Sequence, residues 1–285
     1  MRRSSLFVPG NNLRMIEKAS RLEVDSVVLD FEDSVAPREK VKCREVVTKG
    51  LIEYDWNDKE VGVRINGLDT DLWLDDLISA VSTRAQFILV PKIERPAEVQ
   101  IIEEAIRYTA RKVGRKDLPK ILVIVENAKG LMAVESIIQA SPLVDAIEFG
   151  SEDYRLSLGI YGASASETSV LYARSRVVAA ASASSIDALD QAFVNLVDLD
   201  GLRASALQAK ELGFTGKAVI HPNQIPIVNE VFTPSDSDVT WARKVLEGWK
   251  IAESEGRGAF RIDDKMVDIV HVKMAERILK TAKPR

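Results

Sequence analysis

The sequence predicts a (β/α)8 TIM barrel, followed by a C-terminal helical extension. Eight short apolar runs recur along residues 4–222, and amphipathic stretches lie between them. Such strict alternation of strand and helix is typical of parallel strands joined by crossover helices. Eight units in about 230 residues fit a closed barrel, and a doubly wound open sheet is the alternative.

The expected strands are runs rich in Val, Ile, Leu or Phe over four to six positions, as in strands that are buried on both faces. In chain order they are SSLFVPG (4–10), DSVVLDFED (25–33), EVGVRING (60–67), QFILVPKIE (86–94), KILVIVEN (120–127), VDAIEFGSED (144–153), SIDALDQAF (185–193) and GKAVIHP (216–222). The clearest helices are LRMIEKASRL, AEVQIIEEAIRYTARKV and LRASALQAKELG, where apolar residues recur at three- and four-residue steps. The last of them ends at Gly213, a natural C-terminal stop.

Beyond the eighth unit lies a segment that a barrel does not need for closure. SDSDVTWARKVLEGWKIAESEG (235–256) predicts a capped helix, GRGAFRIDDKMVD (256–268) a loop with a short strand, and IVHVKMAERILKTAK (269–283) a final helix. We therefore expect a catalytic barrel domain over 1–233 and a C-terminal extension over 234–285, the segment in which the resemblance described below implies a lid. The extension is expected to pack across the barrel or onto a neighbouring subunit.

Composition excludes several classes of protein. The net charge of −4, with 29% charged residues, argues against a basic nucleic-acid binder. The single cysteine, Cys43, rules out a disulfide framework within the chain. The apolar runs are far shorter than the roughly 18 residues of a membrane span. The run after Arg2-Arg3 ends at Pro9, too soon for a signal-peptide core. We expect a cytoplasmic protein with no membrane or nucleic-acid partner.

Polar side chains end several of the expected strands. In a barrel, active sites are built at the carboxyl ends of the strands and in the loops that follow. The residues at these positions are Asp30, Glu32, Asp33, Arg64, Asn66, Lys92, Glu94, Glu126, Glu148, Glu152, Asp153 and His221. Any one of them has an equally good interpretation as an ordinary polar loop residue. The gathering of acids and bases at one rim predicts a site.

Two of these acids suggest a metal. Glu126 and Asp153 follow adjacent strands, so their carboxylates could lie within a few ångströms. Like charges that close need a cation between them or a shared proton. Oxygen ligands, in a chain with one cysteine and two histidines, favour Mg²⁺ or Mn²⁺ over zinc. We therefore expect a metal at the mouth of the barrel.

Basic residues complete the expected site. The planar fork of Arg64 could clamp a carboxylate or carbonyl oxygen, and a salt bridge to Glu32 or Asp33 is the alternative. Lys92 is equally well explained by a structural ion pair.

The start of a helix with basic residues is a second candidate site, for binding a phosphate group. The turn VPGNN (8–12) opens a helix with Arg14 and Lys18 on one face, which suits a phosphate. The alternative is that Arg14 and Lys18 lie on an ordinary solvent-exposed helix face. His271, within the last helix, is expected to serve ordinary packing.

Taken together, several blocks of this sequence resemble a known family. They are SLFVPGNNLRMIEKA, VVLDFEDSVAPREKVKCR, VRINGLDTDLWLDDL, LVPKIE, VENAKGL, FGSEDY, AVIHPNQI and GAFRIDDKMVD. Their order is similar to that of the citrate lyase β-subunit-like branch of the HpcH/HpaI aldolase and malyl-CoA lyase superfamily, over nearly the whole chain. The resemblance implies a barrel and Mg²⁺. It also implies reversible cleavage of a 3-hydroxyacyl-CoA, such as malyl-, citramalyl- or citryl-CoA, to acetyl-CoA and a 2-keto acid.

The resemblance also implies roles for individual residues. Glu126 and Asp153 would be the metal ligands, and Arg64 would hold the substrate's oxygens. Positions that contact CoA or substrate would be Phe7, Arg14, Lys18, Ile220 and His221, and the polar positions behind the ligands would be Glu32, Asp33 and Lys92. Asp268 would be a catalytic aspartate on a lid supplied by a neighbouring subunit, in a homotrimer or higher oligomer. The alternative is that Asp268 only caps the final helix.

The sequence departs from the family pattern at three places. Ser157 replaces an acid in the loop after Asp153, Asp264 replaces a glycine in the lid, and no proline follows Asp268. Two other functions stay open: a thioesterase acting on malyl-CoA or a relative, and a β subunit of a citrate lyase complex acting on acyl-carrier-protein thioesters. Nothing in the residues distinguishes glyoxylate, pyruvate and oxaloacetate as the keto product.

Overall fold

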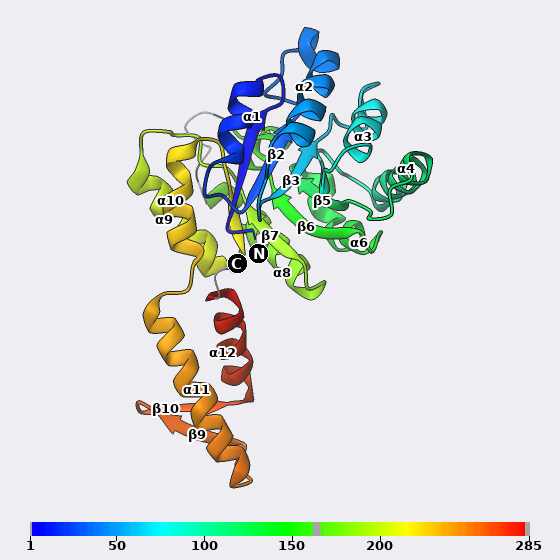
Figure 1. The fold of residues 1–285 in the computed structure, drawn as a ribbon. Coiled ribbons are helices and arrows are strands. Elements are labelled where there is room, and N and C mark those ends of the chain that lie inside the picture. Colours follow the sequence, from blue (N-terminus) through cyan, green and yellow to red (C-terminus); the bar gives the residue numbers. More distant parts are fainter. Residues whose placement is uncertain (1, 162–165, 167, 283–285) are drawn as a thin grey trace. The chain divides into compact units, whose positions relative to one another are not determined.

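Eight parallel strands close into a barrel in chain order, with helices around it (Figure 1). The structure is a computed structural model that describes residues 2–161, 166 and 168–282. The strands are β1 Ser4–Pro9, β2 Ser26–Asp30, β3 Glu60–Arg64, β4 Phe87–Val90, β5 Lys120–Val125, β6 Val144–Phe149, β7 Asp187–Asp190 and β8 Gly216–Val219. β8 pairs with β1, where Leu6 lies opposite Val219. The predicted barrel is confirmed, and the open sheet is wrong.

Helices follow the strands as the alternation predicted. They are α1 Leu13–Ser20, α2 Lys40–Glu53, α3 Trp73–Val81, α4 Pro96–Val113, α5 Ala128–Met132, α6 Val134–Gln139, α7 Ser151–Ser157, α8 Thr168–Ala183, α9 Leu199–Leu212 and α10 Ile225–Phe232, with 3-10 turns η1 Pro37–Glu39 and η3 Pro222–Gln224. Local chemistry sets several ends. The side chain of Asn12 accepts a hydrogen bond from the N–H of Met15 and caps α1. Gly213, with φ of 101°, ends α9 in the left-handed region as expected.

The barrel interior is apolar below its mouth. Its core cluster is Val28, Phe87, Leu89, Leu122, Ile124 and Ala146, with Phe7 packed against it. Gly62 on β3 makes room for this filling, because a Cβ there would lie 2.4 Å from the ring of Phe87. Burying each large side chain contributes about 1.5–3 kcal/mol. The closed interior therefore provides a rigid frame for the polar groups at the strand ends.

Two buried ion networks tie distant segments together. At the amino end of the barrel, Arg2 hydrogen-bonds Glu60 at 2.5 and 2.8 Å, Asp145 at 2.6 Å and Asp187 at 3.2 Å. Between α8 and the last two strands, fully buried Asp190 pairs with Arg174 at 2.9 Å and Lys217 at 2.6 Å. The first network joins the amino ends of the strands, whereas Asp190 of the second is the last residue of β7. Both networks stabilise the frame.

The chain divides into two compact units, residues 1–229 and 230–285. The second unit contains α11 Asp236–Ser254, strands β9 Ala259–Ile262 and β10 Lys265–Asp268, and α12 Ile269–Ala282. Ser235 caps α11, as the sequence predicted. The core of this unit consists of Ala242, Val245, Val267, Val272 and Ala275. Residue 283, the last of the expected final helix, lies outside the described residues.

The segment before the final helix differs from its prediction. A loop with one short strand was expected, but β9 and β10 form an antiparallel hairpin in which Lys265 pairs with Ile262. Its two turn residues, Asp263 and Asp264, have φ of 45° and 66°. Positive φ at both positions is the geometry of a tight type I′ turn, and Asp tolerates it better than most residues other than glycine. The sequence lacked the glycine that usually marks such a turn.

The helices give no sign of a membrane span. Within the described part of the chain, none is both long enough and apolar enough to cross a bilayer.

Candidate active site

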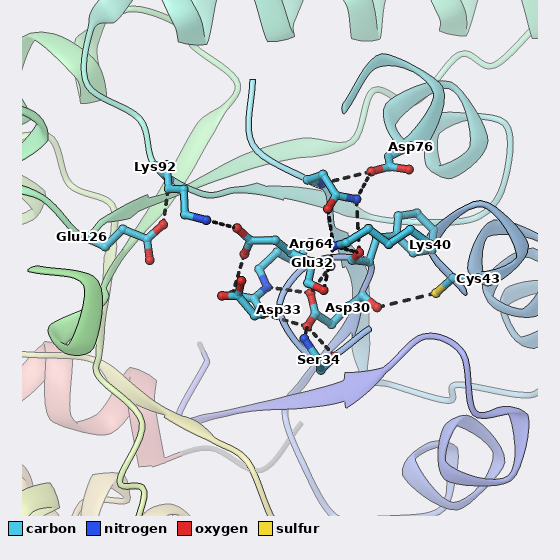
Figure 2. A network of polar contacts seen from close by, with 12 residues as sticks. Asp30, Glu32, Asp33, Ser34, Lys40, Cys43, Arg64, Asp76, Lys92 and Glu126 are labelled. Atoms are coloured by element: carbon cyan, nitrogen blue, oxygen red, sulfur yellow. Dashed lines mark hydrogen bonds and ion pairs between the residues drawn. The ribbon is translucent and has the colours of Figure 1, made fainter. Parts of the chain in front are cut away.

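Charged side chains from the ends of neighbouring strands meet at the mouth of the barrel (Figure 2). Asp30 ends β2, with Glu32 and Asp33 in the loop that follows, and Arg64 ends β3. Lys92 and Glu126 follow β4 and β5, while Asp153 comes from α7, after β6. The parallel barrel places all of these ends on one side, as the sequence predicted.

Arg64 forms the centre of this network. Its Nε lies 2.6 Å from Asp30 Oδ1 and its Nη2 lies 2.7 Å from Asp30 Oδ2, which makes a bidentate pair. Its Nη1 lies 2.9 Å from Glu32 Oε2 and 3.5 Å from Asp33. The guanidinium also lies over the ring of Phe7, 5.2 Å from its centroid. The rim salt bridge expected as the alternative for Arg64 is therefore present, and its main partner is Asp30.

Burial and pairing act in opposite directions on these groups. Burial works to lower the pKa of Arg64, but the hydrogen bonds and charge of Asp30 and the charge of Glu32 outweigh it and raise the pKa. Burial works to raise the pKa of Asp30, but the hydrogen bonds and charge of Arg64 outweigh it and lower the pKa. Asp30 Oδ2 also accepts hydrogen bonds from the N–H and hydroxyl of Ser34, at 3.1 and 2.5 Å. The Arg64–Asp30 pair is thus charged and fixed.

Lys92 links two carboxylates of the mouth. Its ammonium donates to Glu32 Oε1 at 2.7 Å, and its backbone N–H donates to Glu126 Oε1 at 2.7 Å. Desolvation opposes its charge, but the hydrogen bond and charge of Glu32 raise the pKa of Lys92. Burial still raises the pKa of Glu32, in spite of Arg64 and Lys92. The structural ion pair expected as one interpretation of Lys92 is present.

Glu126 is a buried carboxylate with one engaged oxygen. Only 4% of the residue is exposed. Its Oε2 lies beside Gly150, where a Cβ would come within 2.8 Å of that oxygen. Burial, followed by the negative charges of Glu32 and Asp153, raises the pKa of Glu126 to about 8. Glu126 and Asp153 are therefore close enough to repel each other.

The chemistry of this donor set fits a hard divalent cation. Among the described residues, no group of three or more His, Cys, Asp and Glu is arranged as a metal cluster. Mg²⁺ does not require one, because it binds through one or two carboxylates and completes its octahedron with water and substrate. A cation at Oε2 of Glu126 would offset the repulsion that raises the pKa of this group.

Glu148 is a further buried acid near this mouth, on β6. Burial raises its pKa to about 8, against the lowering effect of Arg64. Its Oε2 has no hydrogen-bond partner among the described residues. The sequence marked Glu148 only as one polar strand end among many, because burial of its carboxyl depends on the packing above it.

The residues expected to contact CoA lie on neighbouring elements. Arg14 and Lys18 are exposed on α1, which follows β1. Ile220 and His221 follow β8, the strand that pairs with β1. The imidazole Nδ1 of His221 lies 2.6 Å from the side-chain oxygen of Asn223. Because β1 and β8 are neighbours, α1 and the segment after β8 follow adjacent strands of the barrel.

Asp268 belongs to the second unit, where it caps α12. Its Oδ1 accepts from the N–H of Val270 at 3.0 Å and lies 2.8 Å from Nδ1 of His271. The hydrogen bond from His271 lowers the pKa of Asp268. His271, expected to serve packing alone, is instead half-buried and paired with this aspartate.

Comparison with known families agrees with the barrel and its mouth. The model of the HpcH/HpaI aldolase/citrate lyase family matches residues 3–222, and that of a C–C bond lyase of the TIM-barrel fold matches residues 168–284. The chain belongs to the HpcH/HpaI aldolase/citrate lyase family. The predicted family and the class of carbon–carbon lyase are confirmed.

Family members of known activity align with nearly the whole chain. An L-malyl-CoA/beta-methylmalyl-CoA lyase of Rhodobacter capsulatus is 35% identical over 99% of this chain and 95% of its own. A mitochondrial citramalyl-CoA lyase of Rattus norvegicus is 36% identical over 99% of this chain and 86% of its own.

A solved structure from the same family agrees as well. It is CitE from Mycobacterium tuberculosis in complex with magnesium, acetoacetate and coenzyme A. It is 29% identical with a TM-score of 0.79, over 98% of this chain and 97% of its own.

Proposed function

We propose that this protein is an Mg²⁺-dependent lyase. It reversibly cleaves a 3-hydroxyacyl-CoA such as malyl-, citramalyl- or citryl-CoA to acetyl-CoA and a 2-keto acid. The observation that carries the proposal is the buried Glu126 at the barrel mouth, which lies within electrostatic range of Asp153 and Arg64. Relatives named for malyl-CoA and citramalyl-CoA cleavage support the substrate class.

Glu126 and Asp153 would hold the metal, with Glu32, Asp33 and Lys92 behind them. Bound Mg²⁺ supplies Lewis-acid polarisation of the substrate oxygen at the breaking bond. The donor set supports this role, since it offers carboxylate oxygens, which Mg²⁺ prefers. The solved CitE complex contains magnesium, in agreement with this assignment.

In the proposed role, Arg64 stabilises negative charge. A guanidinium has five N–H groups, and two of them hydrogen-bond Asp30, while Nη1 forms ion pairs with Glu32 and Asp33. An N–H outside the Asp30 pair would meet a substrate oxygen. Because Asp30 fixes the fork in advance, Arg64 meets developing charge without reorganising.

Proton balance requires a base in the condensation direction. During cleavage the bond between the hydroxyl-bearing carbon and the acetyl methylene carbon breaks. The hydroxyl loses its proton, and the methylene carbon gains one to become the methyl of acetyl-CoA. In reverse, a carboxylate must remove that methyl proton, and we assign this step to Asp268. His271 and the N–H of Val270 engage Oδ1 of Asp268, so Oδ2 is the oxygen that would take the proton.

We assign Asp268 to a lid exchanged between subunits of a homotrimer or higher oligomer, in a cytoplasmic enzyme. Asp268→Ala and Glu126→Ala chains should each be nearly inactive. Once mixed and reassembled, they should recover part of the activity, because some sites then combine an intact metal pocket with an intact lid. Inactive mixtures with demonstrated subunit exchange would refute the exchange. If Asp268 serves only as a cap, its loss costs about 1 kcal/mol of stability and leaves turnover unchanged.

CoA would lie along the arc of the mouth formed by β1, α1 and the end of β8. Phe7 and Ile220 offer apolar contact there, and the exposed Arg14 and Lys18 suit phosphate groups. His221 follows Ile220 at the same edge. Arg14→Ala should therefore raise the KM for CoA thioesters more than it lowers kcat.

The decisive experiment is a screen of 2-keto acids with acetyl-CoA and Mg²⁺, read by mass spectrometry. A new hydroxyacyl-CoA identifies the keto acid and supports condensation and cleavage. If malyl-CoA instead yields free CoA and intact hydroxy acid, the thioesterase alternative holds. Failure with every CoA thioester, but turnover of acyl-carrier-protein thioesters, would identify a citrate lyase β subunit.

A further inference from the structure

We propose that Lys92 positions Glu126 through its main chain. The left-handed backbone at Lys92 directs its N–H onto Oε1 of Glu126 and leaves Oε2 as the oxygen for the cation. The inference rests on the proposed function for the assignment of Glu126 as a metal ligand. It adds Lys92 as a residue that positions the Glu126 carboxylate through its main-chain conformation.

The backbone of Lys92 is the first observation. Its φ is +57°, in the region that L-residues with large side chains avoid. The other non-glycine residues with positive φ in the described chain are Asn57, Ser185, Asp263 and Asp264, all with short polar side chains. Lys92 differs from these residues in its long side chain, although it follows Pro91. Strained residues of this kind persist only where their surroundings hold them, and they cluster at functional sites.

The surroundings that hold Lys92 are two carboxylates. Its N–H donates to Glu126 Oε1 at 2.7 Å, and its ammonium donates to Glu32 Oε1 at 2.7 Å. Figure 2 shows Lys92 between these two acids. The bond to Glu126 depends on the path of the main chain after β4 and not on lysine chemistry. A return to negative φ would redirect that path and move the N–H or the following loop.

The other oxygen of Glu126 is directed by Gly150. A side chain at position 150 would begin 2.6 Å from Glu126 Cβ and 2.8 Å from its Oε2. Gly150 precedes α7, the helix that carries Asp153. Glu126 is therefore held by a hydrogen bond at Oε1 and has space at Oε2, on the side of the second proposed ligand.

A substitution series at residue 92 separates conformation from charge. Lys92→Gly, Lys92→Asn, Lys92→Ala and Lys92→Val all remove the ammonium, but they differ in their tolerance of positive φ. The measurement is Mg²⁺ affinity of the full chain by calorimetry, without substrate. We expect similar Kd values for Mg²⁺ in the Gly and Asn variants. The Kd should be several-fold higher in the Ala variant and about tenfold higher or more in the Val variant. The reason is that the left-handed conformation costs a non-glycine residue a free energy that corresponds to about a tenfold change in Kd.

Asn57 provides a matched control. It has φ of 49° in the segment between α2 and β3, away from the mouth. Asn57→Gly and Asn57→Val impose the same backbone contrast there. They should change the melting temperature and leave the Kd for Mg²⁺ unchanged.

The inference would be overturned by equal Mg²⁺ affinities across the residue 92 series, even if melting temperatures fell from Gly to Val, because that pattern marks a merely structural role. If the Val variant does not fold, equal Kd values for Mg²⁺ in the Gly and Ala variants would overturn the inference. A native chain that binds no Mg²⁺ would refute the proposed function itself. Mg²⁺ binding without any dependence on residue 92 would refute this inference alone.

Discussion

Replacement of Arg64 by lysine keeps the positive charge at the barrel mouth but removes its planar fork. In the native protein the guanidinium contacts both oxygens of Asp30, at 2.6 and 2.7 Å, and reaches Glu32 at 2.9 Å. A lysine ammonium is a single point of contact on a flexible stem. It cannot serve both acids with the same geometry, so a buried carboxylate loses a partner.

The size of the effect on catalysis follows from the contact that the fork would make with a substrate oxygen. Loss of one charge-assisted hydrogen bond to that oxygen costs about 1.5–3 kcal/mol. Each 1.36 kcal/mol corresponds to a tenfold change, so kcat/KM for the condensation of acetyl-CoA with its keto acid should fall by about tenfold to a hundredfold. Stability should also fall, because Asp30 is almost fully buried and depends on this arginine.

The assay is steady-state condensation kinetics together with urea denaturation of the same preparations. Arg95→Lys is the matched control, since Arg95 is an exposed arginine paired with Glu98 three residues away and should tolerate the change. If Arg64→Lys kept kcat/KM within twofold of the native value, the clamp would be refuted and Arg64 would have a structural role only.

Three other perturbations test the remaining assignments. Chelation should abolish turnover and Mg²⁺ restore it, while Glu126→Ala or Asp153→Ala should lower kcat/KM by orders of magnitude with a native circular dichroism spectrum; full activity in chelator would exclude the metal. His271→Phe should move the acidic limb of the kcat/KM–pH profile to higher pH. The reason is that His271 lowers the pKa of Asp268, so without it the base is protonated at a higher pH; an unmoved limb argues against Asp268 as the base. Asp190→Asn should lower the free energy of unfolding by about 3–5 kcal/mol in urea titrations, because two buried cations lose their charged partner; a loss below about 1 kcal/mol would contradict this.

The barrel was predictable because its strands are buried on both faces. Ile121 to Val125 are apolar without a break, and Glu126 follows at the point where the strand leaves the interior. The same transition marks the ends of several other strands. A sequence records such a change in environment directly, so the rim and its acids could be found without coordinates.

The sequence could not predict in the same way which of the acids at the rim pairs with Arg64. Asp30, Glu32 and Asp33 look alike in sequence, yet Asp30 is the acid whose two oxygens both meet Arg64, because it lies at the buried end of β2 opposite Arg64 in the barrel register. The buried pair of Arg174 and Asp190 was missed, since charged residues on a helix usually indicate a solvated face. Such choices depend on register and packing between segments distant in sequence.

The network around Arg2 has a consequence for the order in which the protein is made. Arg2 is synthesised 185 residues before its partner Asp187. At 5–20 residues per second, that interval is roughly 10–40 s. β8, which pairs with the free edge of β1, is made later still. β1 is synthesised before the other barrel strands and is sealed only by β8, so its free edge depends on protection from aggregation until translation of the barrel is complete.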